Sequence, residues 1–481
     1  MMKTKLLDFQ ETAYNKLKGL KIGALYMEMG LGKTRTTLEL IQYRLNKKKI
    51  ERVLWLCPCS TKQNLKDQIE EHSDLIDFID IYGIETMSQS DRTYLEVYEK
   101  VQKHKYMLIV DESNLIKNFF AKRSERIREI AIFCKYKIIL NGTPVTRNEA
   151  DLFNQWYTLD WRVLGYRSYY SFCKNHLILD EKTNRVKEVK NTEYLTNRIS
   201  PYSYQAYKKE VLHLPDKKFE RYYFELTKEQ QKEYYIDRDI LIQKLEAAED
   251  HQVSIIIYKL FTALQLVLSG RKINTFEYLQ HEPFFKDPND NPRIKKLLEV
   301  IKKFNQDEKI IIWCKYTQEI KDIESVLKEQ YGVGSTALFY GDISLKERNK
   351  EIERFKTDAR FLIGNKASGG YGLNLQFCST MIFYSNDFDW GTRAQAEDRI
   401  HRIGQNIEPL YIDIIAADTL DERIISNLGR KESLAAALKR LLKRKNKNIK
   451  AWIDGGDAYG KKKRICHDRR SDGSRQKIPG K

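Results

Sequence analysis

Short uninterrupted apolar runs recur in both halves of the chain. Continuous runs of this kind are typical of strands that are buried on both faces of a parallel sheet. Segments with helical spacing flank these runs, such as residues 6–18 with apolar positions 6, 9, 13 and 17. The runs lie at residues 22–27, 53–56, 107–110 and 136–140, and again at 310–313 and 381–384. The pattern therefore predicts an α/β fold with two parallel-sheet lobes.

The composition changes between these two groups of strands. Residues 151–285 are rich in aromatic and charged side chains and contain few strand-like runs. Two helices are expected there, over residues 226–245 with a start at Thr227 and over residues 255–268. We predict four parts: a first lobe at 1–150, a helical insertion that completes the first lobe and includes a linker at 151–291, a second lobe at 292–430, and a basic helix with a disordered tail at 431–481.

A phosphate-binding loop is predicted between the first apolar run and the helix that follows it. The loop, residues 29–34, reads Met-Gly-Leu-Gly-Lys-Thr. Gly30 and Gly32 allow the backbone to turn its amide groups toward phosphate oxygens, and Lys33 adds a cation for the outer phosphates. The hydroxyl of Thr34 is a candidate ligand of Mg²⁺. The loop therefore predicts binding of a nucleoside triphosphate.

Two adjacent acids follow the apolar run at 107–110. Asp111 and Glu112 are expected at the carboxyl end of that strand, where open α/β sheets bind ligands. Asp111 can hold Mg²⁺ directly or through water, and Glu112 can orient and deprotonate an attacking water. Adjacent acids are common in loops, but a phosphate loop elsewhere in the same lobe favours catalysis over a solvated turn.

Three further residues are candidates for contact with nucleotide or nucleic acid. The Gln10 amide, on or beside the first helix, both donates and accepts hydrogen bonds and so matches the edge of adenine. Ser60 and Lys62 follow the strand at 53–56 and suit a backbone phosphate at a helix start. The competing interpretation is that Ser60 or Thr61 simply caps that helix.

Two arginines lie in the segment from Gln395 to Gln405, far downstream of the phosphate loop. Arg399 and Arg402 are three residues apart, so on a helix they share one face. Two guanidinium groups repel each other unless an anion lies between them, and their planar fork suits phosphate. The alternative is a helix face that pairs with neighbouring acids. We predict that the two lobes close on one nucleotide.

The formal net charge of +18 at pH 7 is concentrated at one end of the chain. Residues 439–481 carry 16 Lys or Arg against 4 Asp. A basic body with a very basic end favours a polyanionic partner, most simply nucleic acid. For the tail itself, the alternatives are a solvated segment that aids solubility and a nuclear-targeting signal.

Several classes of protein are disfavoured by the composition. The sequence has no run of about 18 apolar residues and no apolar signal core at its start, so neither a membrane span nor secretion is expected. The seven cysteines form no CxxC pair, so we expect free thiols in a reducing compartment and no zinc site. The expected location is the cytoplasm of a bacterium or a phage-infected cell, or the nucleus of a eukaryote.

Four motifs occur in the order that helicases use. They are Met-Gly-Leu-Gly-Lys-Thr at 29–34, Asp-Glu-Ser-Asn at 111–114, Asn-Gly-Thr-Pro at 141–144, and the segment 395–405. Together they resemble the SWI/SNF-type ATPases, the double-stranded-DNA translocase branch of helicase superfamily two. The resemblance implies two RecA-like lobes with a helical insertion, ATP and Mg²⁺ as ligands, double-stranded or branched DNA as the partner, and a monomeric motor.

By the same resemblance, Arg399 and Arg402 act as arginine fingers on the terminal phosphate. The resemblance also implies that the glycine-rich turn at 366–375 meets both DNA and nucleotide, with Lys366 at the DNA backbone and Gly372 at the nucleotide.

Three residues depart from the family pattern. Met27, Asn114 and Asn141 stand where the family usually has Asp, His and Thr. Position 114 usually helps to couple nucleotide state to DNA contact, so the strength of that coupling is open. The favoured function is ATP-driven translocation on double-stranded DNA. The alternatives are a fork-regression or branch-migration helicase in replication, recombination or repair, and a nucleotide-gated DNA clamp that does not translocate.

Overall fold

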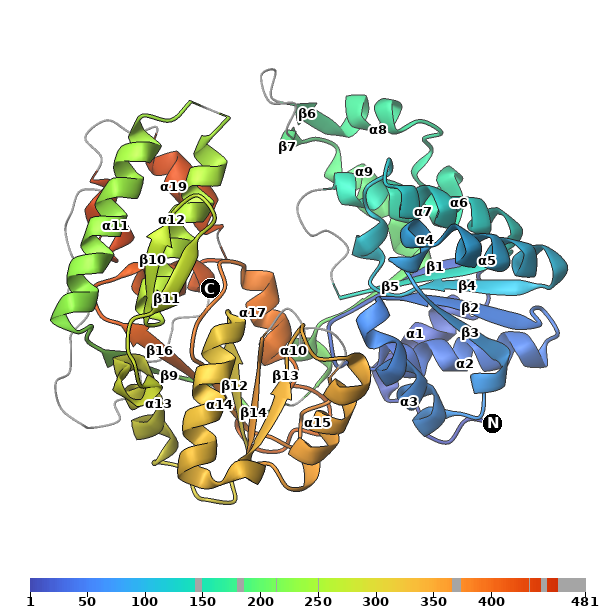
Figure 1. Cartoon of the computed structure of the whole chain (residues 1–481). Coiled ribbons are helices and arrows are strands. Elements are labelled where there is room, and N and C mark those ends of the chain that lie inside the picture. The colour runs from blue at the N-terminus through green and yellow to red at the C-terminus, as the bar shows by residue number, and fades with distance from the viewer. Residues whose placement is uncertain are drawn as a thin grey trace.

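The protein forms two lobes, each built on a six-stranded parallel sheet (Figure 1). The computed structural model describes residues 1–142, 149–179, 186–212, 214–249, 251–365, 373–431, 433–442 and 448–456. The predicted α/β class with two parallel-sheet lobes is confirmed. Each sheet is covered by helices on both faces, which explains why its central strands are continuous apolar runs.

The first sheet gathers five strands from the first third of the chain and one later strand. Their order is β3 (Ile79–Gly83), β2 (Arg52–Cys57), β4 (Tyr106–Val110), β5 (Tyr136–Asn141), β1 (Ile22–Met27) and β8 (Ser203–Ala206). Alternate residues of each strand point to opposite faces. One face packs against α1 (Asp8–Leu17), α2 (Lys33–Asn46) and α3 (Lys62–His72). The other packs against α4 (Thr86–Gln89), α5 (Asp91–Lys103), α6 (Lys122–Phe133) and α7 (Ala150–Leu164).

The second sheet has the same kind of construction. Its order is β13 (Thr336–Phe339), β14 (Phe361–Asn365), β12 (Ile310–Cys314), β15 (Thr380–Phe383), β16 (Leu410–Ala416) and β9 (Lys218–Phe224). One face packs against α13 (Pro292–Ile301), α14 (Thr317–Tyr331) and α18 (Leu420–Gly429). The other packs against α15 (Leu345–Thr357) and α17 (Trp390–Glu397).

The middle of the chain is divided between the lobes, which differs from the predicted boundary at residue 292. Strand β9 pairs with β16 along its whole length, so the second sheet already includes residues 218–224. The helical hairpin of α11 (Lys228–Glu246) and α12 (Val253–Leu268) also packs into the second lobe's core. Only the segment up to β8 completes the first lobe. The sequence conceals this because β9 is an edge strand with mostly exposed or half-buried side chains and therefore has no continuous apolar run.

Each lobe carries an excursion that rises on the same side of the molecule (Figure 1). On the first lobe it consists of α8 (Tyr169–His176), the hairpin β6 (Leu177–Leu179) and β7 (Val186–Val189), and α9 (Thr192–Ile199). On the second it consists of α11, α12 and the hairpin β10 (Arg271–Thr275) and β11 (Gln280–Pro283). The predicted start of the first insertion helix is confirmed, because the Thr227 hydroxyl accepts the N–H of Gln230 (3.2 Å) as an N-cap.

Part of the predicted basic tail is a structural element of the second lobe. Helix α19 (Leu434–Leu442) buries Leu434, Leu438 and Leu441, and α20 (Ile449–Ile453) buries Trp452. Both join the core that contains α11 and α12. The predicted helix therefore uses its apolar stripe for packing. Disorder is predicted for residues 455–481, of which residues 457–481 lie outside the described residues.

No helix among the described residues is both long and apolar enough to cross a membrane.

Candidate nucleotide site between the lobes

The glycine loop connects β1 to α2, and its backbone adopts a conformation that favours glycine. Gly30 and Gly32 have φ angles of 81° and 77°. The Lys33 ammonium donates a hydrogen bond to the carbonyl oxygen of Met27, the last residue of β1 (2.9 Å). Lys33 and Thr34 begin α2, where the first N–H groups have no partner within the helix. The loop therefore presents a cation and several amides at a helix N-terminus, as phosphate binding requires.

Gln10 braces this loop from α1. Its side-chain amide donates to the carbonyl oxygen of Leu31 (2.9 Å) and accepts from the backbone N–H of Leu7 (3.1 Å). A Cβ atom on Gly32 would overlap the Gln10 amide, so the close approach requires glycine there. The sequence predicts that Gln10 reads adenine. The structure places it at the loop, where it holds the loop in shape, and the contact with adenine stays a prediction.

Asp111 and Glu112 follow β4 at the carboxyl edge of the first sheet. The Asp111 carboxylate accepts the backbone N–H of Glu112 (2.9 Å). Burial, together with the neighbouring Glu112 carboxylate, raises the pKa of Asp111 to about 7, while the Lys33 ammonium opposes that rise. The electrostatic effect of Lys33 on Asp111 places the glycine loop and the acids in one site.

Glu112 has an unusual backbone conformation for a residue with a side chain. Its φ and ψ angles are 48° and 55°, in the left-handed region. Its carbonyl oxygen accepts the N–H of Leu115 (2.9 Å), which starts a short 3-10 turn. Strain of this kind is concentrated at functional sites, where the surrounding structure holds it in place.

The donor groups at this edge of the sheet fit Mg²⁺. The Thr34 hydroxyl makes no hydrogen bond with any described residue, whereas the hydroxyls of Thr36 and Thr37 bond to backbone carbonyls one turn earlier. Asp111 supplies a buried carboxylate with a raised pKa, and a bound cation would lower that pKa. Magnesium in nucleotide sites is held mainly by phosphates and water, with one or two protein oxygens. Thr34 and Asp111 match that need.

The segment with the predicted arginine fingers has a different local structure from the one expected. Helix α17 ends at Glu397, and residues 398–404 form tight turns, so the two arginines do not share a helix face. The N–H of Arg399 bonds to the carbonyl three residues earlier, at Ala396 (3.1 Å). The carbonyl of Arg399 instead accepts the N–H of Leu375 (3.2 Å), so it leaves the helical pattern and ties this segment to the end of the glycine-rich turn.

Both arginines nevertheless reach the phosphate loop of the other lobe. Arg399 is 4% exposed, and its guanidinium lies 3.8 Å from the sulfur of Met29. The stem of Arg402 lies against Gly30, close enough that a Cβ atom on Gly30 would be 2.6 Å from the Arg402 Cβ. The structure therefore brings the two predicted arginines and the predicted phosphate loop together, as expected for lobes that close on one nucleotide.

The Arg402 guanidinium is held by the last residues of the glycine-rich turn. It donates to the carbonyl oxygen of Leu373 (3.4 Å) and to the side-chain oxygen of Asn374. Burial lowers the pKa of Arg402 below its ordinary value. A desolvated guanidinium beside a phosphate loop is a strong site for an anion. Lys366 and Gly372, which the sequence predicts at DNA and nucleotide, lie outside the described residues.

Ser60 and Lys62 lie at the carboxyl end of β2, on the same edge of the sheet as Asp111. The expectation that a hydroxyl caps α3 is not met, because neither Ser60 nor Thr61 accepts an N–H of that helix. The Thr61 hydroxyl instead donates to the carbonyl of Pro58 (2.9 Å). The Ser60 hydroxyl makes no hydrogen bond with any described residue, and Lys62 is exposed. Both remain available to a phosphate of the predicted DNA partner.

Two of the residues that depart from the family pattern carry buried atoms that find no hydrogen-bond partner among the described residues. These atoms are the side-chain oxygen of Asn114 and the side-chain nitrogen of Asn141. The first is an acceptor in the turn after β4, and the second is a donor on the last residue of the neighbouring strand β5. Buried polar atoms in this state are uncommon and are costly to leave unpaired.

Sequence reasoning missed three residues that join the two halves of this site, one directly after β1 and two in the connection between the lobes. Glu28 accepts a hydrogen bond from the backbone N–H of Lys208. The ammonium groups of Lys208 and Lys217 pair with Asp398 and Glu397 of the arginine segment. A lysine in a polar stretch carries no signal of its own, because most lysines are solvated. Only the fold shows that these are at the site.

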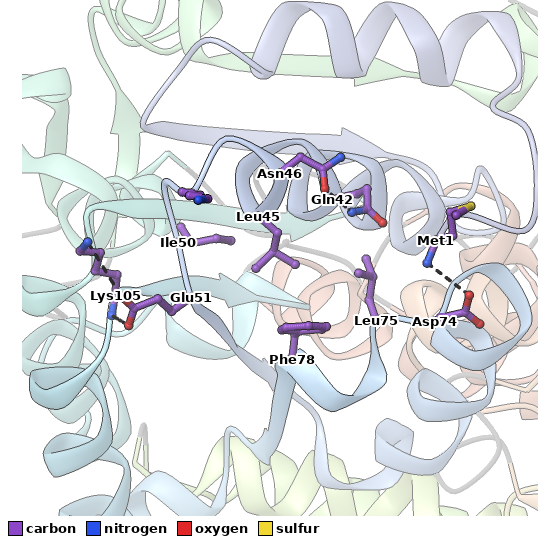
Figure 2. A pocket seen from close by; sticks show the side chains of 11 residues that line it. Met1, Gln42, Leu45, Asn46, Ile50, Glu51, Asp74, Leu75, Phe78 and Lys105 are labelled. Atoms are coloured by element: carbon purple, nitrogen blue, oxygen red, sulfur yellow. Dashed lines mark hydrogen bonds and ion pairs between the residues drawn. The ribbon is translucent and has the colours of Figure 1, made fainter.

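One hollow among the described residues lies away from this site. It has a volume of about 660 Å³ and is bordered by Leu45, Ile50, Leu75 and Phe78 (Figure 2). Ile50 and Phe78 precede strands β2 and β3, so this hollow is at the amino edge of the first sheet. It is therefore on the opposite edge from Asp111 and the glycine loop.

The fold and the site define a two-lobed protein with a phosphate-binding loop in one lobe and two arginines against it from the other. Comparison with known families agrees with this class. The family described as the SNF2-related domain matches residues 14–279, and the helicase conserved C-terminal domain matches residues 292–404. The chain belongs to the SNF2-related family.

Relatives include bacterial and eukaryotic proteins. An "Uncharacterized ATP-dependent helicase" of Mycoplasma pneumoniae is 26% identical over 90% of this chain and 42% of its own length. The "TATA-binding protein-associated factor MOT1" of Saccharomyces cerevisiae is 26% identical over 91% of this chain and 28% of its own length. The chain thus spans less than half the length of these relatives.

Among solved structures, the chain aligns with the "Sulfolobus solfataricus SWI2/SNF2 ATPase core in complex with dsDNA". The identity is 22% and the TM-score 0.41, over 92% of this chain and 96% of that one. A TM-score of this size does not establish the fold, which is established by the sheet topology.

Proposed function

We propose that this protein is an ATP-driven translocase that acts on double-stranded DNA. The observation that carries the proposal is the position of Arg399 and Arg402 against Met29 and Gly30, because it builds one nucleotide site from two lobes. A site divided in this way converts binding and hydrolysis into relative motion of the lobes. Membership of the SNF2-related family and the net charge of +18 support DNA as the track.

Each side chain has a definite task in the proposed hydrolysis. Lys33 and the loop amides bind the β- and γ-phosphates, and Thr34 and Asp111 would hold Mg²⁺, which neutralises phosphate charge when bound. Glu112 accepts a proton from the water that attacks the γ-phosphorus. The bond to the β-phosphate oxygen breaks, and ADP leaves. The two arginines stabilise the charge that develops on the transferred group.

The proposed DNA contacts lie on both lobes. Ser60 and Lys62 stand on the carboxyl edge of the first sheet, beside the nucleotide site. We assign Lys366 to the same DNA strand from the second lobe by family resemblance. Phosphate contacts of this kind give affinity without sequence preference, so binding should weaken steeply with salt.

The first test is ATP hydrolysis with and without duplex DNA. The wild-type protein should be stimulated by linear duplex, and Lys33→Ala should abolish hydrolysis because the outer phosphates lose their cation. Lys16→Ala, in an exposed part of α1, is a suitable control. Unchanged DNA-stimulated hydrolysis in Lys33→Ala would contradict the assigned site, and stimulation by RNA alone would contradict the assigned track.

One observation favours branched DNA as a second candidate substrate. Phe120 and Tyr170 are 61% and 74% exposed, and their rings are 6.2 Å apart on the excursion side of the first lobe. Exposed aromatic rings suit stacking on unpaired bases, which forks and junctions offer and linear duplex does not. Fork regression predicts stronger stimulation by forks and Holliday junctions than by duplex, with loss of that preference in Phe120→Ala.

The buried, unpaired atoms of Asn114 and Asn141 favour a third candidate, a nucleotide-gated clamp. If the acidic motif and the strand β5 are weakly linked, hydrolysis need not drive movement. A clamp would hydrolyse ATP and hold DNA without displacing a bound third strand.

A further inference from the structure

The chain passes from the first sheet to the second once, between Ala206 and Lys218. Strand β8 is at the edge of the first sheet and β9 is at the edge of the second. The connection begins with the short helix α10 (Lys208–Val211), which lies between the lobes (Figure 1). Lys208 is 7% exposed, which is unusual for a lysine.

The backbone of Lys208 belongs to the first lobe. Its N–H donates to the carboxylate of Glu28 (2.7 Å), and the N–H of Glu28 donates to the carbonyl of Ala206 (3.1 Å). Glu28 directly follows β1 and precedes the glycine loop. The start of the connection is therefore fixed to the base of the phosphate-binding loop.

The side chain of Lys208 belongs to the second lobe. Its ammonium donates to the carbonyl oxygen of His401 (2.8 Å) and forms an ion pair with the carboxylate of Asp398 (2.7 Å). Asp398 directly precedes Arg399, and His401 directly precedes Arg402. One ammonium group thus holds the residue before each predicted arginine finger.

The far end of the connection adds three contacts with the same segment. The Lys217 ammonium pairs with Glu397 (3.0 Å), and the His401 ring bonds to the carbonyl oxygen of Pro215 (3.0 Å). Lys208 differs from Lys217 because it is more deeply buried and is also bound to the phosphate-loop side. Lys217 also lies 3.6 Å from Asp398, so loss of the Lys208 ammonium would leave that carboxylate with only the longer contact.

We propose that Lys208 is a positioning residue that sets the closed arrangement of the two lobes. It transmits the position of the phosphate loop, through Glu28, to the segment that carries Arg399 and Arg402. It touches neither reacting atom, so it acts through that segment. The inference rests on the proposed ATPase activity of this site and does not depend on DNA.

The test compares Lys208→Met with Lys209→Met. Methionine keeps the length and apolar stem that a buried site accepts, and Lys209 is the exposed neighbour on the same helix. Lys208→Met should lower kcat for DNA-independent ATP hydrolysis by about tenfold or more, with the ATP dissociation constant changed by less than about threefold. Lys209→Met should match the wild type, and Lys208→Arg should recover part of the loss.

Lobe closure provides a second readout. Dyes at Lys103 and Glu353, exposed positions on α5 and α15, report the distance between the lobes. A non-hydrolysable ATP analogue should shorten that distance in the wild type and in Lys209→Met, and should shorten it less in Lys208→Met. If thermal melting shows that Lys208→Met does not fold, Asp398→Asn removes the same ion pair with little change in shape and is measured in the same way.

The outcomes separate this inference from the proposed function. Equal kcat and equal closure in Lys208→Met and Lys209→Met would overturn the role of Lys208. Nucleotide-driven closure that depends on Lys208, in a protein that DNA does not stimulate, would support the inference and contradict the DNA translocase.

Discussion

Arg402 of the second lobe lies directly on Gly30 of the first. A Cβ atom on Gly30 would be 2.6 Å from the Cβ of Arg402, a distance that two such atoms do not adopt. The glycine is needed twice, for its φ angle of 81° and for this approach. The glycine at position 30 of the phosphate loop therefore allows the contact between the lobes.

Gly30→Ala should therefore keep the arginines away from the nucleotide. The expected result is a fall in kcat of about tenfold or more, because the lobes cannot close fully, together with a lower melting temperature from an alanine at a positive φ angle. Gly19→Ala, in the same lobe, has open space around its Cα and should behave as the wild type. Steady-state hydrolysis and thermal melting of both variants provide the check.

Arg399→Ala and Arg402→Ala should separate binding from hydrolysis. Arginine fingers act mainly on the transition state, so kcat should fall on the order of 10³ in each variant. Affinity for ATP should change little, since Lys33 and the loop amides remain. Fluorescent-nucleotide titration and single-turnover hydrolysis measure the two quantities. A loss of affinity as large as the loss of rate would assign these arginines to binding alone.

The local chemistry of the site could be predicted from the sequence, and its connections could not. Gly30, Lys33 and Asp111 stand beside continuous apolar strands, so motif and strand appear together in the sequence. Strands β8 and β9 lie at sheet edges and lack an apolar run, so the crossing between lobes is hidden. The role of Lys208 could not be predicted either, because a lysine in a polar stretch carries no signal of its own. Its importance comes from Glu28 and Asp398, which are 180 and 190 residues away in the chain.

The position of Arg399 shows a second limit of sequence reasoning. A spacing of three predicts a shared helix face only where a helix continues, and α17 ends at Glu397. Two residues beyond the end of the helix, the carbonyl of Arg399 bonds to the N–H of Leu375, a contact between segments. The two arginines reach the loop through turns, and periodicity does not describe turns.

Trp452 should anchor the C-terminal segment to the second lobe. It is buried in α20, its carbonyl oxygen accepts a hydrogen bond from Arg423 (2.7 Å), and the Arg423 guanidinium lies 4.5 Å from its ring centre. Trp452→Ala should destabilise the second lobe by about 3–5 kcal/mol. Lys450→Ala, which removes an exposed pair with Asp239, should cost about 0–1 kcal/mol.

Hydrogen exchange resolved by lobe distinguishes this role from a general loss of stability. Faster exchange in α11, α12 and α18, with unchanged exchange around β1 and β4, is the expected pattern for Trp452→Ala. Equal effects of Trp452→Ala and Lys450→Ala would mean that α20 is not an anchor.

Asp237 should make the stability of the second lobe depend on pH. Burial, with Glu233 adding to it and Lys272 opposing it, raises the pKa of Asp237 to about 7. One of its carboxylate oxygens is buried without a hydrogen-bond partner. The folded protein therefore holds a proton between about pH 4 and pH 7 that the unfolded chain releases. The contribution of the protonated Asp237 carboxyl group to stability is present at low pH and is lost as the pH rises through 7.

Asp237→Asn should consequently stabilise the protein at pH 8 and have less effect at pH 5.5. Asp239→Asn is the matched control. Burial alone would raise the pKa of Asp239, but hydrogen bonds from Lys450 and Arg238 hold it below its ordinary value, so its removal should destabilise. Urea midpoints at the two pH values test both signs. An Asp237→Asn effect that does not change between them would contradict the assignment.

Displacement of a triplex-forming strand from duplex DNA tests the central claim most directly. The wild-type protein with ATP should release the third strand, because a motor that moves along the duplex must pass through it. Lys33→Ala, and the wild type with a non-hydrolysable analogue, should leave the triplex intact. ATP hydrolysis by the wild type with no release of the third strand would contradict translocation and support the clamp.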